Sequence, residues 1–225
     1  MPPQESDVGP FVVKDCALVA IATGLTAQNL RELRDHLLAV PLSSVYYHFW
    51  GGRLRPVFED PQYNNDFAIW CHYTVHDDIL AERLAVIDPK DFPDSEDLRQ
   101  EVVDIIDQRI DEIVRPTWVS HDRQFNFIRS QIVVFDARIR IDKPVDLVEA
   151  VPNMSLSSIF YNFIDARRRT PGAIDDFRTW LSGFGDAYEA TCGALAGVDP
   201  YFVTLVELRA QLGELFQLFL GGESA

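Results

Sequence analysis

Three of the five histidines lie in one stretch of the first half of the chain, among other polar and aromatic side chains. Histidine titrates near neutral pH, so His48 is the candidate general acid or base. A ligand site in this stretch would be lined by Tyr47, His48, Trp50, Arg55, Asn65, Asp66 and His72. The pattern predicts a small-ligand pocket if these side chains converge.

His72 and His76 are four residues apart, which places both rings on one face if the segment is an α-helix. That spacing occurs in metal sites, and Asp66, Asp77 or Asp78 could add a carboxylate. The sequence lacks the neighbouring glutamate that zinc proteases carry between such histidines. We therefore expect no metal and no cofactor, and keep His72 and His76 as the metal-binding alternative.

Sequence templates of catalysis are missing from the chain. It has no glycine-rich dinucleotide loop, no phosphate-binding loop and no nucleophile elbow. Carboxylates are abundant, but nothing in the sequence indicates which two would meet, so acid–base roles cannot be assigned. These observations favour a non-catalytic protein and leave an enzyme as the alternative.

The elements that would position these residues occur twice along the chain. Segment 42–49 returns as 156–163, and segment 66–70 returns as 176–180. The order is kept, and the offset falls only from about 114 to about 110 residues. Such self-similarity at a fixed spacing is typical of an internal duplication.

Each copy opens with a β-branched segment that predicts a strand, at 11–21 in the first copy and at 127–141 in the second. A buried helix is the alternative for 11–21. Apolar spacing and capping residues then predict helices, among them 29–40, 95–113 and 205–219. The fold class that follows is mostly α (α+β), a strand-plus-helices module present twice.

The predicted boundaries are 11–115 for copy one and 123–220 for copy two, with flexible termini at 1–10 and 221–225. The copies would be related by a pseudo-two-fold axis, and their strands could form one small shared sheet.

The repeated residues also have a purely structural interpretation. Phe67 and Trp70 are the kind of aromatic side chain that fills a core. Ser44, Ser158 and Asp66 are predicted to be helix N-caps, because their side chains can accept hydrogen bonds from unpaired backbone N–H groups.

Charge and composition exclude several classes of partner. Segment 59–113 holds 16 Asp and Glu against 4 Lys and Arg, in a chain with a net charge of −15. Such a surface repels nucleic acid and anionic membranes. The sequence has no apolar run of about 20 residues and no leader pattern. Three scattered cysteines fit reduced thiols, so we expect a cytoplasmic protein.

The last predicted helix carries apolar residues that include Leu212 and Phe216. It offers more apolar surface than one buried face needs, which predicts a homo-oligomer or another protein partner. The alternative is that this helix completes the core of copy two.

Several segments are distinctive: Val12-Val13-Lys14-Asp15-Cys16-Ala17-Leu18, Asn29-Leu30-Arg31-Glu32-Leu33, Ser44-Val45-Tyr46-Tyr47-His48-Phe49-Trp50, Asn65-Asp66-Phe67-Ala68-Ile69-Trp70 and Leu80-Ala81-Glu82-Arg83-Leu84. Together they make the chain resemble a bacterial and archaeal family known as domain of unknown function 5752, from Phe11 to about Phe219. The resemblance implies no assigned activity, cofactor or catalytic residue. It also implies an accessory role beside glycosyltransferases or trehalose-type enzymes, with a carbohydrate-related ligand or an enzyme partner.

The leading hypothesis is a non-catalytic interaction or regulatory module that self-associates. The first alternative is a small-ligand-binding or metal-assisted enzyme with its pocket in copy one. The second is an accessory protein of sugar metabolism, in which exposed rings of Tyr47 and Trp50 would stack on a sugar.

Overall fold

The computed structural model describes residues 8–54, 62–114 and 117–224, with side chains up to residue 222. Over these residues the protein is 61% helical and has one small antiparallel sheet of two strands. The expected class, mostly α within α+β, is therefore confirmed. Within the described ranges, no helix combines the length and the apolar character that crossing a bilayer requires.

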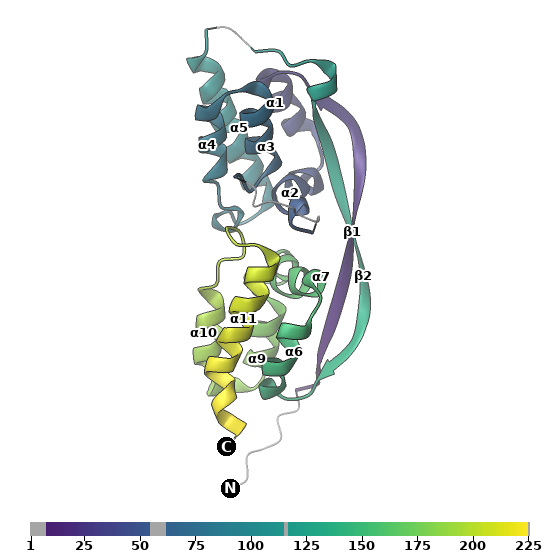
Figure 1. Cartoon of the computed structure of the whole chain (residues 1–225), viewed down its shortest axis with the longest axis vertical. Coiled ribbons are helices and arrows are strands. Elements are labelled where there is room, and N and C mark those ends of the chain that lie inside the picture. The colour runs from purple at the N-terminus through teal and green to yellow at the C-terminus, as the bar shows by residue number, and fades with distance from the viewer. Residues whose placement is uncertain (1–7, 55–61, 115–116, 225) are drawn as a thin grey trace. The chain divides into compact units, whose positions relative to one another are not determined.

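The two strands are β1 (Phe11–Ala27) and β2 (Phe125–Ile141), and they pair with each other (Figure 1). The sequence predicted both strands and gave their pairing as one possible arrangement. Each strand contains one residue with positive φ, Gly24 in β1 and Arg138 in β2. Arg138 lies 114 positions after Gly24, so the irregularity falls at the same place in both strands.

The described chain divides into two compact units. Unit 1 consists of residues 8–17 with 133–224, and unit 2 consists of residues 18–132. Each strand contributes to both units, because β1 leaves unit 1 after Ala17 and β2 enters it at Val133. These boundaries differ from the predicted copies, which stay a prediction about how the chain arose.

Unit 2 contains α1 (Leu30–Ala39), α2 (Leu42–Trp50), α3 (Asp66–Trp70), α4 (Asp78–Ala85) and α5 (Ser95–Glu112). Helix α5 packs against α1, α2 and α4. Helix α1 begins where Asn29 accepts a hydrogen bond from the Glu32 N–H, and it buries Leu30, Leu33 and Leu37 on one face. The local sequence pattern therefore accounts for both the start and the orientation of α1.

Unit 1 contains α6 (Leu147–Asn153), α7 (Leu156–Ile159), α8 (Ala166–Arg169), α9 (Asp176–Ser182), α10 (Glu189–Ala196) and α11 (Leu205–Leu220). Helix α11 packs against α6, α7 and α10, and it begins with the predicted capping box of Thr204 and Glu207. Leu212 and Phe216 are fully buried. The helix therefore completes the core of unit 1, which was the alternative to an interface at these residues.

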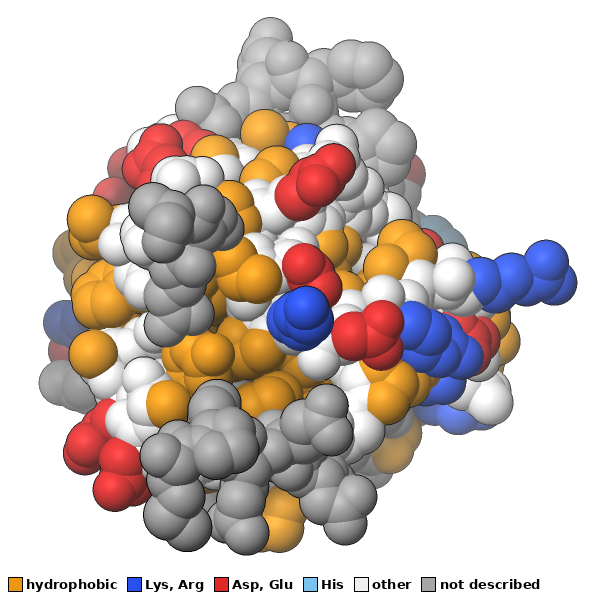
Figure 2. Space-filling view, turned by 90° about the horizontal axis from the view of Figure 1, so that it is seen from below, with side chains coloured by type: hydrophobic (Ala, Val, Ile, Leu, Met, Phe, Trp, Pro, Cys, Tyr) orange, Lys and Arg blue, Asp and Glu red, His pale blue; other side chains and the backbone are white. Residues whose placement is uncertain are grey.

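Some apolar side chains of α11 nevertheless remain exposed, notably Leu218 and Phe219. On the face that Figure 2 shows, apolar side chains gather among a few charged ones. The other exposed residues of α11 are the polar Glu207, Gln211, Glu214 and Gln217 together with Val206 and Ala210. Most of this helix is thus an ordinary amphipathic helix.

The predicted serine caps are wrong. Ser44 lies inside α2, where its N–H donates to the Pro41 carbonyl. Its hydroxyl donates to the Ile128 carbonyl and caps no helix. Helix α7 is capped by Ser155, which accepts a hydrogen bond from the Ser158 N–H. An N-cap side chain must precede the first helical turn, and Ser44 and Ser158 come too late in the chain.

Two π-helical segments interrupt the α-helical pattern, Cys71–Val75 in unit 2 and Phe160–Asp165 in unit 1. Sequence periodicity did not predict them, because a π-turn adds about one residue to a single turn and leaves no compositional signal. Both segments carry residues considered below.

Candidate functional site

His48, the predicted acid or base, is buried in unit 2 with both ring nitrogens engaged. Its Nε2 accepts a hydrogen bond from the Ile128 N–H of β2 at 3.1 Å. Its Nδ1 therefore carries the proton and donates to Asp66 Oδ2 at 2.8 Å. Phe67 and Phe125 cover the ring. This histidine joins α2 to β2 and has no ring nitrogen left for a substrate.

Asn65 and Asp66 lie beside His48 at the start of α3. The cap of α3 is Asn65, whose Oδ1 accepts from the Ala68 N–H at 2.8 Å. The predicted cap, Asp66, is one residue too late and instead bonds to His48. Asn65 also donates to the Leu84 carbonyl at 2.9 Å. Both side chains therefore hold elements of unit 2 together.

Tyr47 and Trp50 are both buried in α2, at 3% and 7% exposure. A sugar stacks on an aromatic ring only when the face of that ring reaches solvent. The argument for a carbohydrate contact at these two rings loses its structural basis. Arg55, another predicted ligand residue, lies outside the described residues.

His72 and His76 do not share an α-helical face. His72 lies in the π-helix Cys71–Val75, and His76 ends it in the left-handed conformation at φ 61°. His72 Nδ1 lies 2.7 Å from Asp78 Oδ1. In the described part of the chain, no three His, Cys, Asp or Glu side chains gather as metal ligands would.

The predicted residues therefore form two groups within unit 2. Tyr47, His48, Asn65 and Asp66 surround the start of α3, whereas His72 contacts Asp78 and Tyr63. A cavity of unit 2 lies elsewhere, beside Leu30, Arg31 and Ile110. None of the predicted ligand-binding or metal-binding residues lines this cavity.

Unit 1 has a contact equivalent to that of His48, made by a different side chain. Asn162 occupies the position of His48 in the repeated segment, and its Nδ2 donates to the Lys14 carbonyl of β1 at 2.8 Å. Ile128 lies 114 positions after Lys14. His48 and Asn162 thus bind backbone groups of equivalent strand residues.

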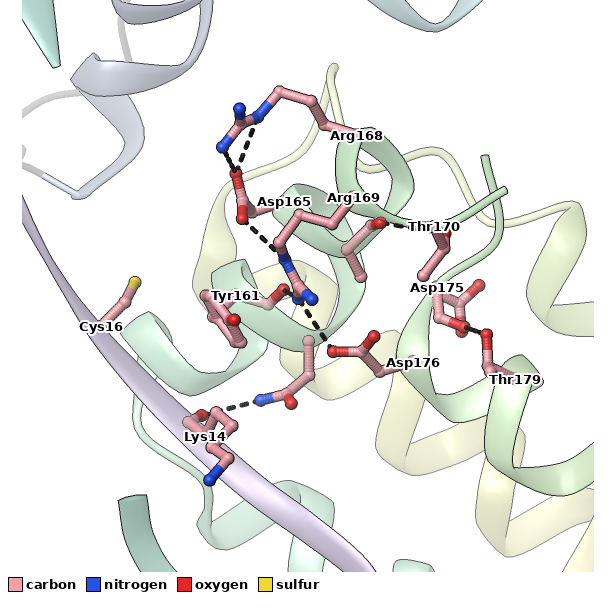
Figure 3. A network of polar contacts seen from close by, with 12 residues as sticks. Lys14, Cys16, Tyr161, Asp165, Arg168, Arg169, Thr170, Asp175, Asp176 and Thr179 are labelled. Carbon is pink, nitrogen blue, oxygen red and sulfur yellow. Dashed lines mark hydrogen bonds and ion pairs between the residues drawn. The ribbon is translucent and has the colours of Figure 1, made fainter. Parts of the chain in front are cut away.

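The main polar network of unit 1 surrounds a buried carboxylate (Figure 3). Asp165 is 1% exposed and bonds to Arg168 Nη2 at 2.9 Å and to Arg169 Nε at 3.0 Å. Arg169 also donates to Asp176 Oδ2 at 2.9 Å. Burial raises the pKa of Asp176, and the Arg169 hydrogen bond opposes that shift.

This network was missed by sequence reasoning, although a local signal existed. The two arginines follow Asp165 by three and four residues, the spacing at which side chains on a helix meet. Each acidic group in the network has an arginine partner, so the arrangement ties the π-helix Phe160–Asp165 to α8 and α9.

The cysteines supply no activated nucleophile. All three are free, and Cys16 and Cys71 are buried. Burial, with smaller contributions from Asp15 and Asp165, raises the pKa of Cys16 to about 12. Burial also raises the pKa of Cys71. Only the thiolate is a strong nucleophile, so neither thiol is suited to attack a substrate at neutral pH.

The fold and these contacts define a mostly helical α+β protein with a two-stranded sheet. Its predicted polar site residues bind the backbone of the protein and one another. The sequence model described as "Family of unknown function (DUF5752)" matches residues 8–217. The chain belongs to this family. The sequence had indicated the same family by resemblance.

One solved structure that resembles the chain is that of OrfY from Thermoproteus tenax. The two share 23% sequence identity and a TM-score of 0.79, over 94% of this chain and 97% of that one. At this identity the likeness shows a common fold and nothing more. No curated protein matches the chain with significance.

Proposed function

We propose that the protein is a non-catalytic interaction module that associates with a second copy of itself. The observation that carries the proposal is the engagement of His48, whose two ring nitrogens bind Asp66 and the Ile128 N–H. A general base needs a free nitrogen within reach of the proton that it takes. The residue best suited to catalysis therefore supports a structural role.

We also propose that the chain arose by internal duplication. Trp70 Nε1 donates to the Arg123 carbonyl at 2.9 Å, and Trp180 Nε1 donates to the Gly9 carbonyl at 2.8 Å. Arg123 lies 114 positions after Gly9, the offset of the repeated sequence segments. Equal contacts to equivalent backbone atoms support a common origin. The two-fold relation between the copies stays a prediction.

A second pair of contacts supports the duplication independently. Arg99 Nη2 donates to the Val40 carbonyl at 2.8 Å, where the chain leaves α1. Arg209 Nη1 donates to the Met154 carbonyl at 2.9 Å, where the chain leaves α6. Both arginines follow a leucine in the repeated motif. Such agreement between distant residues is the result that duplication predicts.

Self-association is supported by an exposed apolar segment of β2 in unit 1. Val133, Val134 and Phe135 are exposed at 47%, 43% and 48%. Three consecutive apolar residues with exposed side chains on a strand are an unusual solvent surface, because natural sheets usually protect such segments with charge. This segment replaces Leu212 and Phe216 as the candidate interface.

The partner class follows from charge and from the thiols. The strongly acidic segment 59–113 opposes nucleic acid and anionic lipid, which favours a protein partner. Three free thiols, two of them buried, support a cytoplasmic location, where cysteines stay reduced.

Sedimentation velocity at tens of micromolar tests self-association. We expect a dimer, and we expect Phe135→Lys to convert it to monomer because the lysine would place a charge in the interface. Leu218→Lys is the matched control, since it places the same charge on the exposed part of α11. A wild-type monomer would contradict the proposal, and loss of the dimer in Leu218→Lys alone would move the interface to α11.

Native mass spectrometry of the same preparation tests the enzyme and ligand-binding alternatives. We expect the mass of the chain and of its dimer without addition. A reproducible extra mass would identify a bound metal or metabolite and favour a ligand site in unit 2.

A further inference from the structure

Unit 2 holds the first part of β2 by an aromatic contact from α3. The rings of Phe125 and Phe67 stack with centroids 5.2 Å apart, and Trp70 meets Phe125 edge-on at 5.8 Å. The Trp70 indole also donates to the Arg123 carbonyl. Side chains of α3 thus hold the Phe125 ring at the start of β2 and the Arg123 carbonyl just before it.

Unit 1 holds the first part of β1 in the same way. The rings of Phe11 and Phe177 stack with centroids 5.0 Å apart, and Trp180 lies 5.6 Å from Phe11. The Trp180 indole donates to the Gly9 carbonyl. Phe125 lies 114 positions after Phe11, so the two strand segments are held by equivalent residues.

Further contacts of unit 1 also go to the segment 8–17. The Asn162 side chain donates to the Lys14 carbonyl, and the Ser155 hydroxyl donates to Asp15 Oδ2 at 2.9 Å. Helices α7 and α9, with the π-helix Phe160–Asp165, therefore form a cradle for one extended segment of about ten residues. We call it the strand cradle.

The two units differ in how the held segment is connected to its helices. In unit 2 the segment belongs to the continuous stretch 18–132, and it follows α5 in the chain. In unit 1 the segment 8–17 is joined to residues 133–224 only through all of unit 2. Every contact that holds segment 8–17 in the strand cradle is non-covalent, and the same segment of another chain would make identical contacts.

We infer that the strand cradle of unit 1 accepts segment 8–17 from a second copy of the chain, and that reciprocal exchange produces the dimer. This inference rests on the proposed self-association and specifies how the two chains associate. Exchange of an identical element between chains requires no new side-chain contacts in the cradle. The exposed residues Val133–Phe135 lie where β2 enters unit 1.

Photo-crosslinking of the full chain tests the exchange. Phe11 is replaced by p-benzoylphenylalanine in one variant, and Phe125 is replaced in the matched control. Equal amounts of light and heavy-nitrogen protein are unfolded together, refolded at tens of micromolar and irradiated. Products are separated on a denaturing gel and their crosslinked peptides are identified by mass.

We expect the variant at position 11 to give a product with the mass of two chains, in which a light position 11 is joined to the region of Phe177 or Trp180 of a heavy chain. The control at position 125 should crosslink within one chain, because its segment is continuous with its own helices. A second pair of variants, at Pro10 and Gln124, avoids replacing a buried ring.

The outcomes separate the two proposals. Only intrachain products at positions 11 and 10, in a fraction that sediments as a dimer, would overturn strand exchange and leave self-association intact. A protein that stays monomeric throughout would overturn both. Two-chain products at position 125 as well as at position 11 would show general proximity and would also overturn the exchange.

Discussion

Unit 1 and unit 2 attach their strands at equivalent places but with different chemistry at one position. In unit 2 His48 accepts a hydrogen bond from a backbone N–H of β2, whereas in unit 1 Asn162 donates to a backbone carbonyl of β1. Tryptophan contacts to the strands are the same in both units. His48 and Asn162 thus attach a strand in the same place with opposite hydrogen-bond directions.

A further difference lies in the polar groups around the attachment. Unit 1 has Asp165 with two arginines, and the equivalent position in unit 2 is Gly51. A Cβ at Gly51 would approach the Tyr47 ring to 2.7 Å, so a carboxylate does not fit there. Local packing at Gly51 therefore leaves no room in unit 2 for a side chain like that of Asp165.

The largest expected effect comes from the aromatic residue that holds each strand. Phe67→Ala and Phe177→Ala each remove a fully buried ring, which costs about 3–5 kcal/mol of unfolding free energy. In Phe177→Ala we also expect faster hydrogen exchange at the amides of 11–16. Urea unfolding and hydrogen-exchange mass spectrometry measure both effects. A loss near 0.5 kcal/mol, typical of surface substitutions, would contradict the prediction.

The next effect tests the two polar attachments against each other. His48→Ala leaves the half-buried Ile128 N–H without its partner, at a cost of about 2 kcal/mol. Asn162→Ala removes the donor to the Lys14 and Ser158 carbonyls, each of which has a second lone pair, and we expect a loss of about 1 kcal/mol. His48→Phe keeps a ring but no nitrogen and serves as the control for packing. Full stability of His48→Phe in urea unfolding would show that the hydrogen bonds do not matter.

A smaller and equal effect is expected for the two indoles. Trp70→Phe and Trp180→Phe each keep an aromatic ring and lose one hydrogen bond to a backbone carbonyl. The expected loss is about 1 kcal/mol in both cases. Unfolding curves of the two variants should nearly coincide, and a clear difference between them would break the equivalence of the units.

The smallest effect concerns pH and involves the carboxylate of Asp136 in unit 1. Hydrogen bonds from Arg140, and then from the Arg138 N–H, hold the pKa of Asp136 below its ordinary value of 3.8. The ionised form is therefore favoured by folding, so its contribution is present above the ordinary pKa and is lost as pH falls through the lower folded value. The carboxylate is exposed and the contribution is small.

The variant Asp136→Asn checks this assignment. Its stability should be slightly below wild type near neutral pH and should approach wild type in acid. The position equivalent to Asp136 in β1 is Ala22, so β1 has no carboxylate at the matching place. A carboxyl resonance of Asp136 that titrates at the ordinary value would contradict the prediction.

Local signals in the sequence predicted much of the fold. The β-branched runs at 11–21 and 127–141 became β1 and β2, and the capping box at Thr204 placed the start of α11. These features depend on neighbouring residues. The cap of α3 was misplaced by one residue because Asn65 and Asp66 are both good caps, and only the long-range bond to His48 distinguishes them.

The attachments themselves could not be predicted. His48 binds a backbone N–H that lies 80 positions away, and every residue except proline carries such a group. The sequence therefore gives no sign of which N–H the ring will meet. The same applies to Trp70 and Trp180, whose partners are backbone carbonyls.

The long separation between segment 8–17 and the strand cradle also governs how the protein can fold during synthesis. Unit 2 has all its residues once position 132 has left the ribosome. Segment 8–17 is made first, but the aromatic residues that hold it, Phe177 and Trp180, emerge about 160 residues later. Domains tend to fold as they emerge, so unit 2 folds before the helices that hold segment 8–17 have been synthesised. During that interval segment 8–17 can meet these helices only in a chain whose synthesis is further advanced.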